Sequence, residues 1–168
     1  KGIPPRRFDM ESFIDAANIC DESVTLAGSG TQPRYRTDGV FSEADDMSLV
    51  LNQFAASMDA RFYDPQGRIA VKCMVNDLGS PIASFTAADI LGAVQWTPFA
   101  DLAENYNLVR GTYTDPSPNS LYQSVDYPEQ YETSADGIDR ILTLDLPLVQ
   151  SAAQAQRLAR RALMRAKY

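Results

Sequence analysis

The sequence predicts an α+β fold with a mixed, mostly antiparallel sheet and helices near both ends of the chain. Apolar residues recur at helical spacing near the N-terminus and again up to the last residues. Between these regions, several short segments rich in Val, Ile, Thr and Tyr are separated by clusters of Gly, Pro, Asn and Asp. Strands in the centre with helices at the two ends are typical of this class.

Length and composition indicate a single globular domain that spans residues 1–168. The chain has 168 residues, of which 45% are hydrophobic and 22% charged. We expect no membrane insertion, because no run approaches the roughly 18 consecutive apolar residues that a membrane span needs. The chain does not begin with Met, and its last helical pattern continues to the final residue. We therefore expect it to be a fragment of a longer polypeptide.

The first helix is expected to follow Asp9, because Asp is a preferred residue at helix N-termini. Four apolar residues would then share one face of this helix: Met10, Phe13, Ile14 and Ala17. The helix should end near Cys20. A turn rich in Gly and Ser at 27–30 then separates two predicted strands at 24–26 and 35–37.

A second helix is expected to begin at Ser42. Asp45 completes the spacing of a capping box, and Glu43 and Asp46 add negative charge at the positive end of the helix dipole. Five apolar residues form one stripe that we expect to face the core: Met47, Val50, Leu51, Phe54 and Met58.

A β-hairpin is predicted next, with strands at 61–63 and 68–75. Between them lies 64–67, which reads Asp-Pro-Gln-Gly and has the residue preferences of a type I turn. Four residues of the second strand should share one face: Ile69, Val71, Cys73 and Val75.

The C-terminal half should hold a short helical turn, three strands and a long helix. Thr86 and Asp89 repeat the capping spacing, and Gly92 would end that turn. The predicted strands cover 94–97, 107–113 and 138–144. Ser151 should cap the last helix, whose narrow apolar stripe permits close packing and consists of Ala155, Leu158, Ala159, Ala162, Leu163 and Ala166.

The composition excludes several kinds of chemistry. Without histidine, the chain cannot form a Ser-His-Asp or Cys-His catalytic site or a His-ligated zinc site. Cys20 and Cys73 belong to no CxxC pair, so we expect free, buried thiols. Helix capping explains Asp45 and Asp46, and turn formation explains four further acids: Asp64, Asp77, Asp115 and Asp126. We predict no catalytic residue, metal site or cofactor.

The last helix carries a basic face on an otherwise acidic chain. The formal charge is −7, whereas Arg157, Arg160, Arg161, Arg165 and Lys167 follow one another without an acid. This face could contact nucleic acid, an anionic surface or the acidic body of a neighbouring subunit, or it could simply be solvated. We expect no specific binding of nucleic acid, because the acidic remainder would repel phosphate.

The segment 116–131 is predicted to be a long polar loop that carries tyrosines. It could be a recognition surface or a lid that packs on its own core. The candidate interaction surface therefore combines this loop with the basic helix and comprises Tyr122, Tyr127, Tyr131, Arg157, Arg161 and Arg165.

One stretch of the chain resembles a known family. Residues 107–116 read NLVRGTYTDP and are followed by Tyr122 and by Asp-Tyr-Pro at 126–128. This order is similar to that of the phage tail tip attachment proteins, also called the host specificity protein J family, which are central hub proteins of long-tailed phages. Four further stretches resemble the family in the same order: 18–22, 33–41, 144–147 and 155–163.

The resemblance implies an internal domain of a tail hub that is a homotrimer and contacts other tail-tip subunits. It implies a place at the virion tail tip, with assembly in the host cytoplasm and at most passing contact with genome DNA. The family offers no catalytic residue for these positions. Pro116 should end the strand before it, and Gly111 indicates a bulge or a close backbone approach.

Two other functions stay open. A tail-associated cell-wall hydrolase would need acids such as Asp115 and Asp126, because histidine is absent. A carbohydrate-binding adhesin would use the tyrosines.

Overall fold

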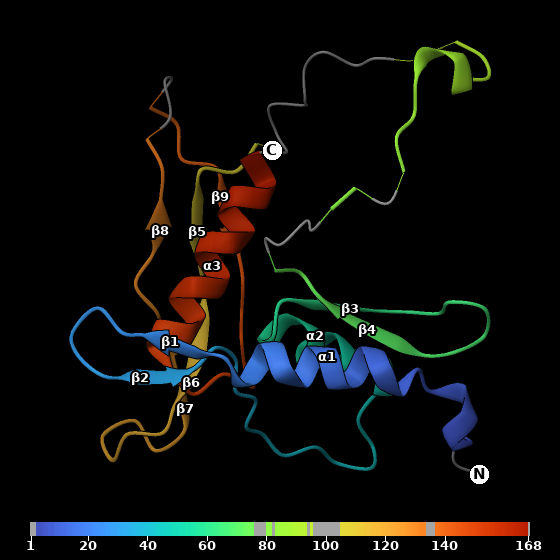
Figure 1. Cartoon of the computed structure of the whole chain (residues 1–168). Helices are drawn as coiled ribbons and strands as arrows, with labels where there is room; N and C mark the ends of the chain where they lie inside the picture. Colours follow the sequence, from blue (N-terminus) through green and yellow to red (C-terminus); the bar gives the residue numbers. More distant parts are fainter. Residues whose placement is uncertain are drawn as a thin grey trace.

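The computed structural model describes residues 3–75, 80, 81, 83–93, 95, 105–133 and 137–167. Within them lie three α-helices, two short 3-10 helices and nine short strands (Figure 1). The helices are η1 (Pro5–Arg7), α1 (Met10–Asp21), α2 (Met47–Ser57), η2 (Ala87–Asp89) and α3 (Ala152–Lys167). The strands are β1 (Ser23–Thr25), β2 (Thr31–Pro33), β3 (Ala60–Tyr63), β4 (Ala70–Cys73), β5 (Leu108–Arg110), β6 (Thr112–Asp115), β7 (Gln123–Asp126), β8 (Gln130–Tyr131) and β9 (Ile141–Thr143). This is an α+β fold, as the sequence predicts.

The strands pair into four small sheets within the described residues. β1 pairs with β2, β3 with β4, and β6 with β7, each antiparallel. In the fourth sheet the central strand β5 is antiparallel to β8 and parallel to β9. The pairing is therefore mixed and mostly antiparallel.

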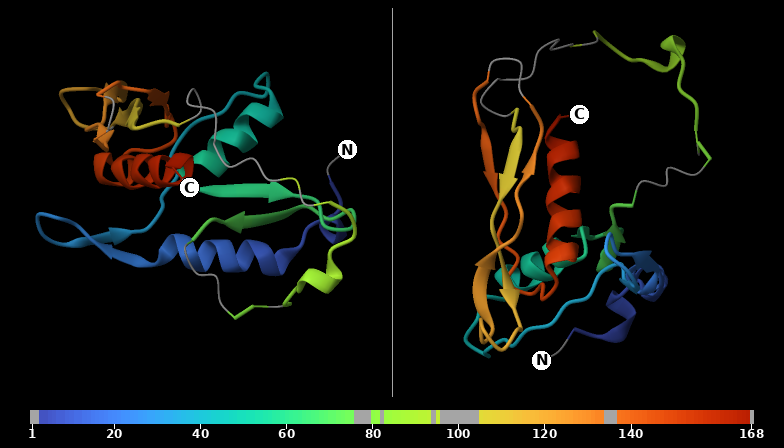
Figure 2. Two further views of the ribbon diagram at one scale, coloured as in Figure 1. Left: turned by 90° about the horizontal axis from the view of Figure 1, so that it is seen from above. Right: turned by 90° about the vertical axis from the view of Figure 1, so that its left-hand side faces the viewer.

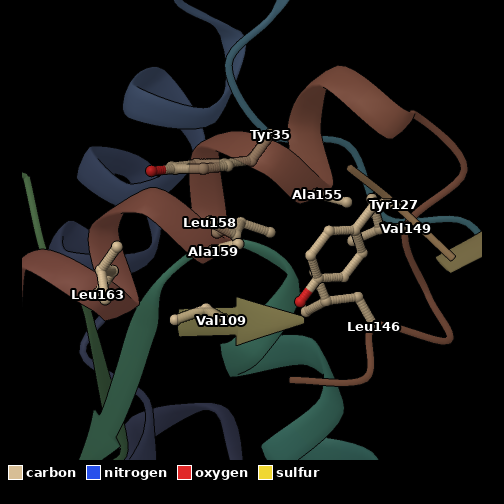
Figure 3. Close-up of a cluster of buried hydrophobic side chains, with 9 residues drawn as sticks. All are labelled: Tyr35, Val109, Tyr127, Leu146, Val149, Ala155, Leu158, Ala159 and Leu163. Carbon is tan, nitrogen blue, oxygen red and sulfur yellow. The ribbon is translucent and has the colours of Figure 1, made fainter. Parts of the chain in front are cut away.

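The larger core lies between α3 and the strands of the C-terminal half. Figures 1 and 2 show α3 running alongside β5, β8 and β9. The predicted alanine–leucine stripe of α3 is confirmed for Ala155, Leu158, Ala159 and Leu163, which are all buried, whereas Ala162 and Ala166 are partly exposed. Figure 3 shows them with the rest of this core, which consists of Tyr35, Val109, Tyr127, Leu146 and Val149.

The smaller core lies between α1 and the β3–β4 hairpin. Its buried residues are Ala16, Ala60, Val71 and Cys73. The hairpin and the inward position of Val71 and Cys73 are confirmed. Three partly buried residues pack against both cores and so connect them: Ile19, Cys20 and Met58.

The buried face of α1 differs from the predicted one. Met10 and Ile14 are exposed, whereas Ala16 is buried. The hairpin contacts the helix on the side of Ala16 and Phe13, whose ring packs near Phe8. The helix follows Asp9 and ends at Asp21, as the sequence predicts, but the Asp9 side chain makes no capping hydrogen bond.

The second predicted strand, 35–37, is not a strand. Gln154 takes up its backbone hydrogen bonds: its side-chain oxygen accepts from Arg36 N at 3.0 Å, and its amide donates to Arg36 O at 2.9 Å. Strand β2 forms earlier, at Thr31–Pro33, while Tyr35 buries its ring in the larger core.

Helix α2 begins later than predicted and faces the core less. Asp46 is its N-cap and accepts from Ser48 N at 2.7 Å, whereas Ser42 and Asp45 close a separate turn. Met47 is exposed, and of the α2 residues only Ser57 is buried. The expectation of a fully core-facing stripe was therefore wrong, because α2 packs against the larger core only near its C-terminal end, through Ala56.

The turn of the β3–β4 hairpin is shifted by one residue. Arg68 N donates to Pro65 O at 3.2 Å, and the central residues Gln66 and Gly67 have φ values of 57° and 81°. Two positive φ values are typical of a type I′ turn, whose twist matches that of a hairpin. The predicted type I turn was wrong.

Other predicted elements are confirmed in part. Thr86 and Asp89 form the expected capping box before η2, and Ser151 caps α3 by accepting from Gln154 N at 3.4 Å. The strand predicted at 138–144 is shorter, at Ile141–Thr143. Asp77 and, apart from residue 95, the strand predicted at 94–97 lie outside the described residues.

Candidate interaction surface

The segment predicted to be a long loop contains regular structure. Strand β6 ends at Asp115, as the following proline predicts, but the chain then turns and returns as β7. The Asp115 carboxylate organises this turn by accepting from the backbone N–H and the hydroxyl of Ser117, at 3.0 and 2.8 Å. Leu121 and Tyr122 follow with positive φ values, and both side chains are exposed at the tip of the hairpin.

An apolar groove lies beside this hairpin tip, and its volume is about 510 Å³. One wall comes from α2 and the segment before it, and the other from the hairpin and residues 147–150. Its apolar and aromatic lining residues include Val40, Phe41, Leu49, Val50, Tyr122 and Leu148. We call this the apolar groove.

The apolar groove presents side chains that would ordinarily be buried. Val40 is 97% exposed and Leu49 is 56% exposed. Two carboxylates at its edge already have partners, since Asp38 pairs with Arg36 at 2.9 Å and Asp45 accepts from Ser42 N at 2.7 Å. The groove therefore exposes mainly apolar surface to a binding partner, and these two carboxylates do not add unpaired charge.

A second exposed apolar segment surrounds η2. Figure 1 shows η2 standing apart from the three α-helices. Phe85 and Leu91 on either side of it are almost fully exposed. The capping box of Thr86 and Asp89 holds the turn between them, with Thr86 N donating to Asp89 at 2.7 Å.

The structure separates the three predicted tyrosines. Tyr122 is 64% exposed and lines the apolar groove. Tyr131 is exposed on β8, opposite Leu108, and does not line the groove. Tyr127 is 2% exposed and lies in the larger core (Figure 3), and its hydroxyl donates to Leu144 O at 2.8 Å, so its assignment to a surface was wrong. Burial raises the pKa of Tyr127.

The three predicted arginines make contacts within the chain. Arg161 and Arg165 both pair with Asp59, at 2.5 and 2.6 Å, and the Asp59 side chain is only 4% exposed. Arg157 donates to Arg34 O at 2.7 Å, and burial lowers the pKa of its guanidinium. These contacts dock α3 onto its own chain, while the Arg165 side chain remains 48% exposed. The role of the three arginines in an interaction surface stays a prediction.

The two acids considered for hydrolysis do not face each other. In the β6–β7 register Asp115 pairs with Gln123, whereas Asp126 pairs with Thr112 at the other end of the ladder. Because successive side chains of a strand alternate between faces, the two carboxylates lie on opposite faces of the hairpin. The hydrogen bonds from Ser120 and Ser117 hold the pKa of Asp115 below its usual range, which is unsuited to a general acid.

Sequence patterns did not predict the apolar groove. Val40 lies in a segment without periodicity, and Leu49 lies off the predicted stripe of α2. The one feature of the sequence that could have indicated the groove was Leu49, an apolar residue at a position that the helical pattern assigns to solvent.

The described part of the chain holds no group of three or more Cys, Asp or Glu side chains that could bind a metal ion. In that same part, none of the helices is long and apolar enough to span a membrane. No model of a known protein family matches the sequence, and no curated protein matches it either.

Proposed function

We propose that this chain is a structural component of a phage or prophage tail-tip hub, with roles in tail assembly, host attachment and genome delivery. The observation that carries this proposal is the apolar groove with its exposed rim. Its exposed residues include Val40, Leu49 and Tyr122. Each Å² of apolar surface removed from water contributes about 25 cal/mol, so contiguous exposed carbon favours association with another protein.

The assignment to a tail hub depends on the resemblance of several ordered stretches, from 18–22 to 155–163, to tail-tip proteins. A neighbouring copy of the same chain is the partner that we propose for the apolar groove, as in a homotrimer. The segment around Phe85 and Leu91 offers apolar side chains of the kind that such a groove would receive. We propose no enzymatic activity for this chain.

The first test is self-association. Leu49→Glu places a charge in the groove, and we expect at least a tenfold weaker association, since about 1.4 kcal/mol corresponds to a factor of ten. Met164 is similarly exposed on α3 and outside the groove, so Met164→Glu is the matched control and should leave association unchanged. Sedimentation velocity over a concentration series measures the difference.

A second measurement addresses the tail itself. Immunogold electron microscopy with an antibody against this chain should label the tail tips of phage particles induced from the source bacterium. Bare particles after mild disruption would contradict the tail-hub assignment. Equal association of wild type, Leu49→Glu and Met164→Glu would contradict the role of the groove.

A further inference from the structure

The two cysteines meet in the smaller core, although they are distant in the sequence. Cys20 lies in the last turn of α1, and Cys73 is the last residue of β4. Both belong to the cluster formed with Ala16, Ala60 and Val71. Cys20 packs against the cluster that contains Cys73, and each thiol shifts the pKa of the other, so the two side chains are neighbours before any reaction.

The surroundings distinguish the two sulfurs. The hydrogen bond from Cys20 lowers the pKa of Cys73, and the positive charges of Arg161 and Lys72 act in the same direction, against burial and Asp59. The same hydrogen bond raises the pKa of Cys20, with burial adding to it. Cys73 is the sulfur that lines a pocket between α1 and β4, whereas Cys20 does not line it, so Cys73 is the thiol that an oxidant in this pocket meets first.

A small pocket gives access to Cys73. It lies between α1 and β4, has a volume of about 190 Å³, and includes Ser12, Val71 and Cys73 in its wall. A water molecule occupies about 30 Å³, so a peroxide of two oxygens fits easily. Three acids also line the pocket, namely Asp9, Glu11 and Asp15. They favour a neutral oxidant over an anionic one.

We propose that Cys20 and Cys73 form a reversible intramolecular disulfide when hydrogen peroxide enters this pocket. The Cys73 thiolate attacks one oxygen of the peroxide, the O–O bond breaks, and the departing hydroxide takes a proton to become water. This leaves a sulfenic acid on Cys73. The Cys20 sulfur then attacks the Cys73 sulfur and the S–O bond breaks. The departing hydroxide takes the proton of the Cys20 thiol, so that two thiols and one peroxide give one disulfide and two waters.

The disulfide would add a covalent link between two elements that are now held together by packing and by a hydrogen bond from Val71 N to Ser12 Oγ at 3.2 Å. Helix α1 would be tied to β4, and the chain between them would become a closed loop. A closed loop reduces the freedom of the unfolded chain, so the oxidised protein should have a higher Tm than the reduced protein. A thiol reductant should reverse both the bond and the Tm shift. The inference is independent of the proposed tail function.

The test treats the purified chain with hydrogen peroxide in slight excess. We expect the loss of both thiols, a mass decrease equal to two hydrogen atoms, and a proteolytic peptide pair that joins Cys20 to Cys73. In Cys20→Ser the sulfenic acid on Cys73 cannot be resolved, so dimedone should trap it there. In Cys73→Ser, Cys20 should remain a free thiol over the same time. Circular dichroism confirms that each variant is folded.

Three outcomes would overturn the proposal. The wild-type chain could keep both thiols under conditions that oxidise a free-cysteine peptide. It could form disulfides between chains in place of the internal bond. Dimedone could label Cys20 in Cys73→Ser as fast as it labels Cys73 in Cys20→Ser, which would show that the pocket does not select Cys73.

Discussion

At Gly111 the backbone between β5 and β6 lies directly against Leu144, in the segment that leads from β9 toward α3. A Cβ atom at this position would overlap the carbonyl oxygen of Leu144 and lie 2.5 Å from its carbonyl carbon. The hydroxyl of Tyr127, which donates to that same carbonyl oxygen, would be 3.0 Å away. Backbone on one side and a hydrogen-bonded side chain on the other leave no room for a methyl group.

Gly111→Ala should therefore destabilise the protein by about 2–4 kcal/mol, because relief of the overlap requires a backbone shift in the larger core. Urea unfolding measures the change. Gly28 is a matched control, since a Cβ there would meet nothing within 4 Å. Gly28→Ala should change stability by less than about 0.5 kcal/mol. Equal effects of the two substitutions would show that the close approach at Gly111 is absent.

Local patterns predict single residues well where the reason is local. A glycine inside a strand pattern indicated the close approach at Gly111, and a proline indicated the strand end at Asp115. Tyr127 could not be placed in this way. It is flanked by Asp126 and Pro128, which resemble a surface turn, and only the approach of Leu144 gives its hydroxyl a buried partner.

Helix α3 is held by polar contacts as well as by its apolar stripe. Gln154 is buried, and its amide also donates to Ser57 O at 2.9 Å, at the end of α2. Further along the helix, Arg161 and Arg165 enclose the carboxylate of Asp59. The helix is thus fixed near its first turn and near its last turns by partners from the same region of the chain.

Asp59→Asn should lower the free energy of unfolding by about 2–4 kcal/mol, because it leaves two arginines facing a buried group without charge. Glu132→Gln is the matched control. Glu132 pairs at 3.1 Å with Arg160, which also lies on α3, and this ion pair is more exposed to solvent. Its cost should be about 0–1 kcal/mol. Thermal unfolding of both variants at low and high salt compares the stability that the two ion pairs contribute. Equal losses of stability in Asp59→Asn and Glu132→Gln would contradict a special role for Asp59.

Periodicity predicted the helices but not their partners. The stripe of α3 could be predicted because its apolar residues repeat at helical spacing. The same pattern was equally consistent with every arginine on the other face being exposed to solvent. The pairing with Asp59 joins residues about a hundred positions apart, which no local pattern encodes. The faces of α1 and α2 were misread for the same reason: a helix can carry more apolar residues than its neighbours cover, as Met10 and Met47 show.

The two cores form one connected body across the described residues. Ile19, Cys20 and Met58 pack against both of them, and Asp59 follows Met58 directly with a φ of 48°. Because the two cores are closely packed through these shared residues, a loss of packing in one core should also reduce the stability of the other. A chain of this length with contiguous cores should unfold in one cooperative step.

Met58→Ala tests this connection, because it removes apolar contacts from both cores at once. We expect a loss of about 1–3 kcal/mol, at the lower end of the range for core methionines since Met58 is only partly buried. Native-state hydrogen exchange should show that the protected amides of β4 and those of α3 lose the same free energy. Leu163 lies in the larger core alone. If unfolding is cooperative, Leu163→Ala should also lower the exchange free energies of the β4 amides and of the α3 amides by the same amount. A loss confined to α3 would instead show that the two cores are separate units joined only by sequence.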